Sequence, residues 1–171
     1  DGVIIKLDNF YNINIINNKV IVGAGCMLNK LALRVSRLGL TGMEFAAGIP
    51  GTVGGAVFMN AGAYKSDMGY IVTSVKVLTP EYTIKTLYNK DLDFHYRTSF
   101  LQKNPLYICL EATITLIKGN TDDMMEIINE RKRRRMESQP LEYPSAGSVF
   151  RNPDGDFAGR LVEDCGLKGF S

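Results

Sequence analysis

The sequence predicts an α+β protein in which antiparallel strands and amphipathic helices build one domain and a second, smaller unit begins. Three observations support this fold class: two hairpin-like runs of β-branched residues, three stretches with helical periodicity, and a break at Ser138-Gln139-Pro140. A chain of 171 residues can bury one good core, or one domain plus part of another. We therefore expect a first domain over residues 1–137 and the beginning of a second over residues 138–171.

The predicted strands form two hairpins and one long strand. Residues 2–7, 12–16 and 19–22 are rich in β-branched side chains, and Asn17-Asn18 supplies a tight turn because asparagine tolerates the left-handed conformation. Residues 71–79 and 82–88 form a second hairpin with Pro80-Glu81 at its turn. Residues 107–117 alternate in polarity, which predicts a long strand. Its predicted inward face consists of Ile108, Leu110, Ala112, Ile114 and Leu116.

Three longer helices are predicted. The first spans residues 28–38, ends at Gly39, and turns inward Leu28, Leu31, Ala32, Val35 and Leu38. The second begins at Asn120 or Thr121, with Asp122 and Asp123 in its first turn and a buried stripe of Met124, Ile127 and Ile128. The third runs from residue 157 to 165, ends at Gly166, and turns inward Ala158, Leu161, Val162 and Cys165.

The second of these helices ends in five consecutive basic residues, Arg131 to Arg135. Five such residues surround a helix completely, so some must face a neighbouring element. Either their stems lie along apolar surface with their charges in water, or one or two of them contact phosphate oxygens. The sequence leaves both interpretations open.

Residues 45–64 carry no charge and contain five glycines. Closely spaced glycines can expose backbone N–H groups, and a helix that begins there favours an anion, so we interpret residues 48–55 as a loop that cradles a phosphate-bearing ligand. A short helix is expected to begin at Thr52 or at the glycines before it and to run towards Met59. Two alternatives are a tightly packed structural turn and a membrane span, but Pro50-Gly51 and the paired glycines make a poor lipid-facing helix. The stretch matches neither the Walker loop nor the dinucleotide-binding pattern.

Composition narrows the class of protein. A formal net charge of +2 is too small to favour a nucleic acid or an anionic membrane surface as partner. Cys26, Cys109 and Cys165 lie far apart in the sequence, and the single histidine, His95, cannot complete a metal site alone. Unpaired cysteines favour a reducing, cytoplasmic setting.

Three stretches taken together resemble one enzyme family, the UDP-N-acetylenolpyruvoylglucosamine reductases of bacterial peptidoglycan synthesis, in their shorter form. The stretches are Gly48–Ala56 with Asn60–Tyr64, Tyr96–Ser99, and Pro140–Pro153 with Ala158-Gly159 and Cys165–Gly169. The resemblance covers essentially the whole chain. It implies an FAD-binding domain of the PCMH/vanillyl-alcohol-oxidase type, followed by the start of a smaller α+β substrate-binding domain.

The resemblance also implies chemistry and cofactors. NADPH reduces FAD, and a hydride then reaches the enolpyruvyl group of UDP-N-acetylglucosamine enolpyruvate, which becomes UDP-N-acetylmuramate after protonation. The FAD-binding positions are Gly48, Ile49, Pro50, Gly51, Thr52, Gly54 and Gly55, with a wall completed by Asn60, Ala61 and Gly62.

Two catalytic residues follow from the same resemblance. Arg97 would stabilise the enolate that hydride addition creates, and Ser148 would donate the proton. Asn152 and Tyr96 are expected to contact substrate, with Tyr96 and Ser99 also supporting Arg97. From the residues alone, a surface ion pair is the better explanation of Arg97, and a turn serine the better explanation of Ser148, which composition does not separate from Ser145.

Two parts of the family pattern have no counterpart in the chain: a first glycine-rich FAD loop, and a third catalytic residue, a glutamate. Glu163 lies in the wrong motif to take that role. We therefore expect an internal fragment that does not turn over substrate by itself. Another FAD-linked oxidoreductase of the same fold and a non-catalytic nucleotide-binding module remain alternatives.

Overall fold

The structure, a computed structural model, describes residues 4–139 and 149–169. The chain divides into two compact units, the first ending at Arg134 and the second beginning at Arg135. The first unit is built on a five-stranded antiparallel sheet with the order β1-β2-β8-β6-β7. The strands are β1 (Ile13–Ile16), β2 (Lys19–Gly23), β6 (Val72–Leu78), β7 (Ile84–Tyr88) and β8 (Ile108–Thr115).

Both predicted hairpins are present. Asn17 adopts a φ of 57° between β1 and β2, and Tyr82 adopts a φ of 58° between β6 and β7. The long strand β8 lies at the centre of the sheet because it pairs with β2 on one side and with β6 on the other. Strands from distant parts of the sequence are thereby joined.

The predicted inward face of β8 is only partly correct. Ala112, Ile114 and Leu116 are buried as expected, but Cys109 is buried in place of Ile108 and Leu110. The pairing with β6 explains the change: Lys76 lies opposite Glu111 and Val77 opposite Cys109, so β8 holds one extra residue at this point. Such a bulge reverses the alternation of side chains, and a one-strand pattern does not reveal it.

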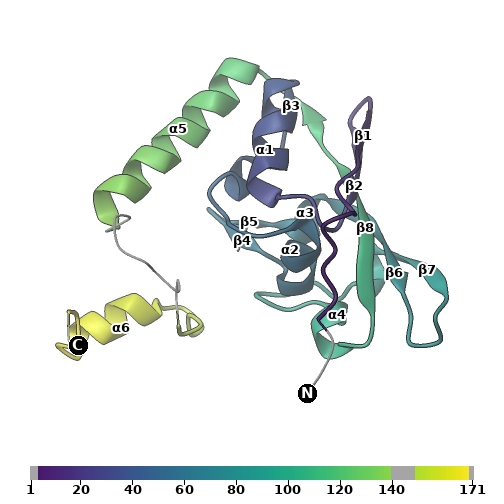
Figure 1. The fold of residues 1–171 in the computed structure, drawn as a ribbon. Helices are drawn as coiled ribbons and strands as arrows, with labels where there is room; N and C mark the ends of the chain where they lie inside the picture. Colours follow the sequence, from purple (N-terminus) through teal and green to yellow (C-terminus); the bar gives the residue numbers. More distant parts are fainter. Residues whose placement is uncertain (1–3, 140–148, 170–171) are drawn as a thin grey trace. The chain divides into compact units, whose positions relative to one another are not determined.

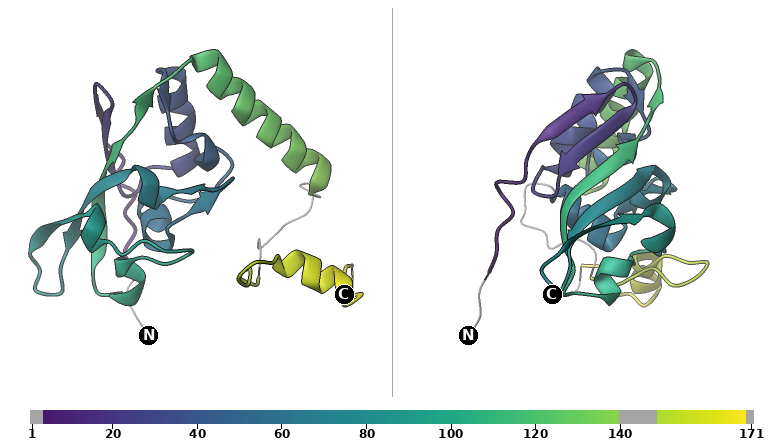
Figure 2. Two further views of the ribbon diagram at one scale, coloured as in Figure 1. Left: turned by 180° about the vertical axis from the view of Figure 1, so that it is seen from behind. Right: turned by 90° about the vertical axis from the view of Figure 1, so that its right-hand side faces the viewer.

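Helices α1 (Leu28–Arg37) and α2 (Val53–Met59) lie on one face of the sheet, as Figures 1 and 2 show. Gly39 ends the first helix with a φ of 75°, as predicted. Four of the five predicted inward residues of α1 are buried. Leu38 is 58% exposed because it already lies outside the helix, and Ser36 is buried instead.

Residues 4–7 adopt no regular strand, so this part of the predicted first strand is wrong. The segment that follows instead crosses closely over Gly23 and Gly25. Gly23 N–H donates to the Asn12 carbonyl (2.9 Å) and Gly25 N–H to the Phe10 carbonyl (2.8 Å). A Cβ on Gly25 would lie 2.0 Å from the Leu7 carbonyl oxygen. The two glycines are therefore required by a close backbone approach.

Gly25→Ala is expected to lower the free energy of unfolding by at least about 2 kcal/mol, because the nearest obstacle is backbone rather than a flexible side chain. The midpoint of urea unfolding measures the effect. Gly159→Ala is the matched control, since a Cβ there meets nothing within 4 Å. An equal, small change in both variants would contradict the close approach.

Helix α5 (Thr121–Ser138) begins after Asn120, whose side-chain oxygen accepts from the N–H groups of Asp122 (2.8 Å) and Asp123 (3.3 Å). Met124 and Ile128 are buried as predicted. Ile127 is 42% exposed, so its assignment to the buried stripe is wrong: the helix buries a narrower stripe than its apolar residues suggest.

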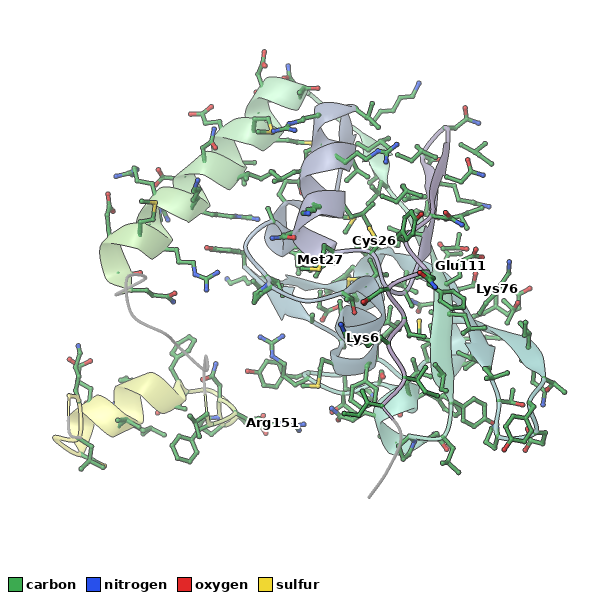
Figure 3. The ribbon with its side chains drawn as sticks, in the orientation of Figure 1. Lys6, Cys26, Met27, Lys76, Glu111 and Arg151 are labelled. Atoms are coloured by element: carbon green, nitrogen blue, oxygen red, sulfur yellow. The ribbon has the colours of Figure 1, made fainter. Side chains whose placement is uncertain are left out.

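The remaining elements of the first unit are short. They are β3 (Leu40–Thr41), which pairs with β9 (Ile117–Lys118), the 3₁₀ turns Glu44–Ala46 and Asn89–Asp91, α3 (Met68–Ile71), α4 (Phe100–Lys103), and the hairpin of β4 (Gly62–Ala63) with β5 (Ser66–Asp67). On the sheet, Lys76 and Glu111 form a cross-strand ion pair of 2.8 Å (Figure 3). Among the described residues, no helix is both long enough and apolar enough to cross a membrane.

Within its described residues, the second unit contains the end of α5 and one complete helix, α6 (Ala158–Asp164), which Gly166 ends with a φ of 70°. Its predicted inward face is wrong for Leu161, which is 39% exposed, and for Cys165, which is exposed. No residue of α6 is buried by the described part of the chain.

Candidate functional site

The glycine-rich stretch is folded around α2. Thr52 is the N-cap, and its Oγ1 accepts a hydrogen bond from Gly55 N–H (3.2 Å). The helix ends at Asn60, which adopts a left-handed conformation with a φ of 43°. The predicted short helix that runs towards Met59 is thus confirmed, and Thr52 rather than an earlier glycine is the residue that caps it.

Backbone hydrogen bonds fasten the start of α2 to the connection between β2 and α1. Val53 N–H donates to the Cys26 carbonyl and Gly54 N–H to the Ala24 carbonyl, both at 2.8 Å. These donors are consequently not available to an anion. Gly51 and Thr52 contribute no N–H to the hydrogen bonds found among the described residues, so they are the backbone donors left for a ligand here.

Glycine occupies the positions of this motif for different physical reasons. Gly51 has a φ of 118°, which favours glycine whatever space surrounds it. Gly54 packs against the β2–α1 connection, where a Cβ would lie 3.0 Å from the Ala24 side chain. Gly55 needs neither explanation, because a Cβ there would meet only Thr52 Oγ1 at 3.5 Å. The structural-turn interpretation therefore accounts for Gly54, whereas Gly55 leaves open space.

That open space is part of a hollow of about 260 Å³. Thr52, Gly54 and Gly55 line it from α2, and opposite walls are formed by Leu101, Tyr107 and Ile108. Cys109 also contributes, but burial raises the pKa of its thiol to about 12, so it remains protonated and unreactive. The hollow combines apolar walls with a glycine surface that a flat ligand can approach closely.

The wall residues that follow α2 have mainly internal contacts. Asn60 is 2% exposed, and both ends of its side-chain amide are hydrogen-bonded within the chain. A Cβ on Gly62 would lie 2.6 Å from the Ser66 carbonyl oxygen, so the β4–β5 hairpin requires glycine there. Tyr64 and Lys65 form its turn with φ values of 55° and 61°. Ala61 is buried.

Arg97 lies at the tip of a tight turn. His95 and Thr98 exchange backbone hydrogen bonds of 3.1 Å in both directions, which places Tyr96 and Arg97 at the two central positions. Arg97 has a φ of 54°, an uncommon conformation for a residue with a side chain. Its guanidinium lies 5.5 Å from the centre of the Tyr96 ring. The ring of Tyr96 and the guanidinium of Arg97 therefore lie next to each other in this turn.

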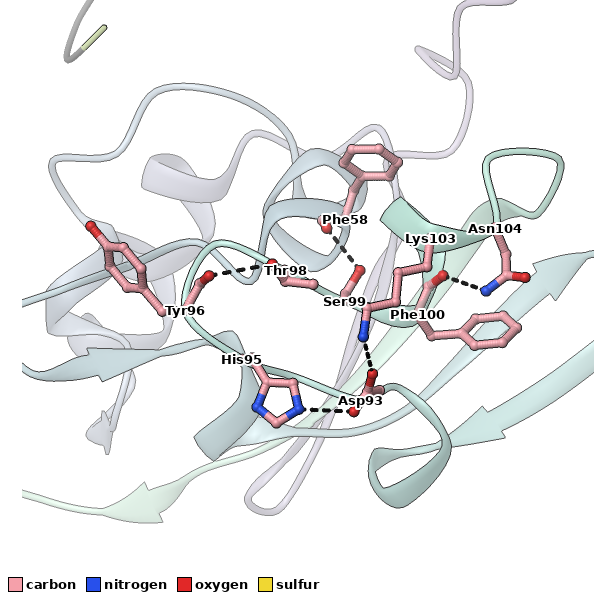
Figure 4. Close-up of polar contacts among 9 residues, drawn as sticks. All are labelled: Phe58, Asp93, His95, Tyr96, Thr98, Ser99, Phe100, Lys103 and Asn104. Carbon is pink, nitrogen blue, oxygen red and sulfur yellow. Dashed lines mark hydrogen bonds and ion pairs between the residues drawn. The ribbon is translucent and has the colours of Figure 1, made fainter. Parts of the chain in front are cut away.

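The Arg97 turn is attached to the last turn of α2 (Figure 4). Ser99 is fully buried, and its Oγ donates to the Phe58 carbonyl at 2.7 Å. The turn is also braced by Asp93, which accepts from Lys103 and His95. The hydrogen bond from Lys103 is the main reason that the pKa of Asp93 lies below its usual value, and His95 adds to it.

The predicted residues of the second unit are only partly described. Ser148, and Ser145 with which it was compared, lie outside the described residues. Asn152 accepts a hydrogen bond from Ala158 N–H through its side-chain oxygen (3.0 Å), and so bonds to the first residue of α6. Glu163 pairs with Lys168 at 2.8 Å, as an ordinary surface ion pair.

The basic run on α5 makes two kinds of contact within the chain. Arg133 and Arg134 pair with Glu130 at 2.7 and 2.6 Å, as charges at a solvated surface do. Arg131 instead lies over the ring of Tyr64, with its guanidinium carbon 4.2 Å from the ring centre. The sequence did not identify Tyr64 as the partner of Arg131, because 66 residues of chain separate the two.

Comparison with known proteins identifies this arrangement. A family model described as an FAD binding domain matches residues 1–88, about half of the chain. The chain belongs to the FAD binding domain family. A second model, described as the C-terminal domain of UDP-N-acetylenolpyruvoylglucosamine reductase, matches residues 139–171. The FAD-binding α+β fold class expected from the sequence is confirmed.

Curated relatives of this chain carry the name expected from its motifs. A UDP-N-acetylenolpyruvoylglucosamine reductase of Anoxybacillus flavithermus is 49% identical over 172 residues, covering 100% of this chain and 57% of the relative. One of Halalkalibacterium halodurans is 49% identical over 170 residues, covering 99% and 56%. The crystal structure of the Thermus caldophilus reductase matches with a TM-score of 0.79 and 36% identity, covering 88% of this chain and 55% of that one.

The resemblance to this family is therefore confirmed. The chain spans between 56% and 57% of the length of these two curated relatives.

Proposed function

We propose that this chain is part of a flavoenzyme that uses NADPH to reduce UDP-N-acetylglucosamine enolpyruvate to UDP-N-acetylmuramate for peptidoglycan synthesis. The observation that carries the proposal is that the two ends of α2 contact two different parts of the expected site. The glycine surface at its start lines an open hollow, and its last turn holds the Arg97 turn. One short helix thus joins the expected cofactor wall to the expected catalytic arginine.

FAD fits the first half of this arrangement. Gly55 leaves space where a Cβ would meet little, the hollow has apolar walls, and Gly51 and Thr52 supply backbone donors. Bound there, FAD would supply the redox chemistry, accepting a hydride from NADPH and passing one to the substrate. Gly48, Ile49 and Pro50 lie in the same loop, and we retain them as proposed contacts.

The chain's own residues supply charge and protons to the substrate. We assign to Arg97 the stabilisation of the enolate that forms on the enolpyruvyl carboxylate, because a planar, permanently charged fork matches a carboxylate. We assign to Ser148 the donation of the proton that completes the reduction. Tyr96 and Asn152 are proposed to contact substrate. For Asn152 the side-chain nitrogen is the relevant group, because the oxygen is bonded to Ala158.

The location and the domain boundary are part of the proposal. A cytoplasmic setting is supported by free cysteines, of which Cys26 and Cys109 are buried and unpaired. A boundary at residues 137–138 is supported by its position between the division of the compact units after Arg134 and the start of the second family match at residue 139.

The full-length protein tests the function directly. It is expected to purify with a yellow flavin colour that NADPH bleaches and the enolpyruvyl sugar nucleotide restores. A flavoprotein that the sugar nucleotide does not reoxidise would favour another FAD-linked oxidoreductase. A colourless protein with no response to added FAD would exclude the proposal.

Gly55→Leu is expected to weaken FAD binding at least about 10-fold in the full-length protein, because the added side chain extends from α2 into the hollow. The thermal midpoint of the FAD-free protein should not fall, since leucine favours a helix more than glycine does. Flavin fluorescence titration measures affinity. Gly159→Leu, on the other helix with open space, is the control. Unchanged affinity in Gly55→Leu would place the flavin elsewhere.

A further inference from the structure

The C-terminal end of α2 carries a buried polar side chain that meets three segments of the chain. Asn60 is 2% exposed, and a buried amide without partners would be costly. Its Nδ2 donates to the His95 carbonyl (2.9 Å), and its Oδ1 accepts from Gly69 N–H (2.9 Å). Because one partner is an acceptor and the other a donor, the orientation of the amide is defined. Asn60 therefore joins α2, the start of α3 and the Arg97 turn.

Ser99 provides a second attachment on the other side of the same turn. It is fully buried and donates from Oγ to the Phe58 carbonyl at 2.7 Å (Figure 4). Residues 95 and 99 are thus both fixed to the last turn of α2, and Arg97 lies between them. With two fixed ends, the chain can hold Arg97 at a φ of 54° instead of relaxing to a more common conformation.

We propose that Asn60 and Ser99 are positioning residues that fix the Arg97 turn to α2, and so set the guanidinium relative to the cofactor wall at the start of that helix. They act through Arg97 and need touch neither cofactor nor substrate with their side chains. The role of Arg97 in the reaction rests on the proposed function. For Asn60 this is a different role from the direct FAD contact expected from sequence, because both ends of its side-chain amide are hydrogen-bonded within the chain.

Asn60→Asp tests the attachment with almost no change of shape. The carboxylate still accepts from Gly69 N–H but cannot donate to the His95 carbonyl. Asn104→Asp is the matched control: it removes a hydrogen bond of the same kind and length, from Nδ2 to the Phe100 carbonyl at 2.9 Å, without touching the turn. Both variants are made in the full-length protein.

The first measurement is amide hydrogen exchange at His95 and Thr98, without cofactor or substrate. Asn60→Asp is expected to raise both exchange rates at least about 10-fold, because the turn opens locally more often. Asn104→Asp should leave them unchanged. Equal rates in the wild-type protein and in Asn60→Asp would overturn the proposal whatever the enzyme catalyses.

The second measurement separates the two half-reactions in stopped flow. Asn60→Asp and Ser99→Ala are expected to slow flavin reoxidation by the enolpyruvyl sugar nucleotide about 10- to 100-fold, since a misplaced group loses its effect on the transition state. Flavin reduction by NADPH should stay as in Asn104→Asp. Equal slowing of both steps would indicate a purely structural role and overturn the proposal.

These outcomes are distinct from failure of the proposed function. If the wild-type protein shows no flavin chemistry, the proposed function fails, and the exchange rates alone decide whether Asn60 holds the turn. If Asn60→Asp does not fold, Ser99→Ala decides both measurements, because it removes one hydroxyl and introduces no charge.

Discussion

Arg97→Lys in the full-length protein is expected to slow the reoxidation of reduced flavin by UDP-N-acetylglucosamine enolpyruvate by about 100-fold. Reduction of the flavin by NADPH should change by less than about twofold, because no enolate forms in that step. Lysine keeps the positive charge but lacks the planar fork that pairs with a carboxylate through two parallel hydrogen bonds. Stopped-flow absorbance of the flavin measures both steps.

The structure makes this substitution a sharp test. Arg97 already occupies a backbone conformation that any side chain finds unfavourable, so lysine adds no new strain. Arg37→Lys, at an exposed position in the last turn of α1, is the control. Equal slowing of both half-reactions by Arg97→Lys would contradict a role restricted to the substrate carboxylate.

Ser148→Ala is expected to slow the same reoxidation step by about 100-fold or more, because general acid catalysis typically contributes that much. Flavin reduction by NADPH and the affinity for FAD should not change. Ser145→Ala is the matched control from the same motif, and its effect should stay below about 10-fold. Rapid-mixing kinetics of the full-length protein provide the measurement.

The comparison of the two variants decides which serine donates the proton. A large effect of Ser145→Ala with a small effect of Ser148→Ala would transfer the proton donor to Ser145. If neither substitution slows reoxidation, the proton comes from another group.

The double variant Arg97→Lys with Ser148→Ala should slow flavin reoxidation by less than the product of the two single effects, because both residues act on one transition state.

Local signals in the sequence predicted much of the fold. Gly39 and Gly166 end their helices in the left-handed conformation, as the pattern of apolar residues followed by glycine indicates. The caps of α5 by Asn120 and of α2 by Thr52 were predictable as well, since each hydrogen bond joins residues no more than three positions apart. The motifs of the chain also predicted its family, because their order and spacing are specific.

Features that depend on distant partners were not predictable in this way. The bulge in β8 arises from its register with β6, so the alternation along β8 alone misplaced Ile108 and Leu110. Leu38 and Ile127 follow a helical period, but the elements of the described chain leave them 58% and 42% exposed. Periodicity reports which face is apolar, and the packing of neighbours determines how much of that face is buried.

The glycine-rich stretch shows both what local sequence determines and what tertiary packing determines. Its composition was sufficient to predict a tight, ligand-approaching loop that leads into a short helix, because glycine conformations and the N-cap are local properties. Only the folded chain shows that Gly54 donates its N–H to Ala24, while Gly55 faces a hollow. Likewise, Asn60 and His95 lie 35 residues apart and meet only through the fold. Hydrogen bonds across such separations depend on how the strands and helices pack, which local sequence patterns do not specify.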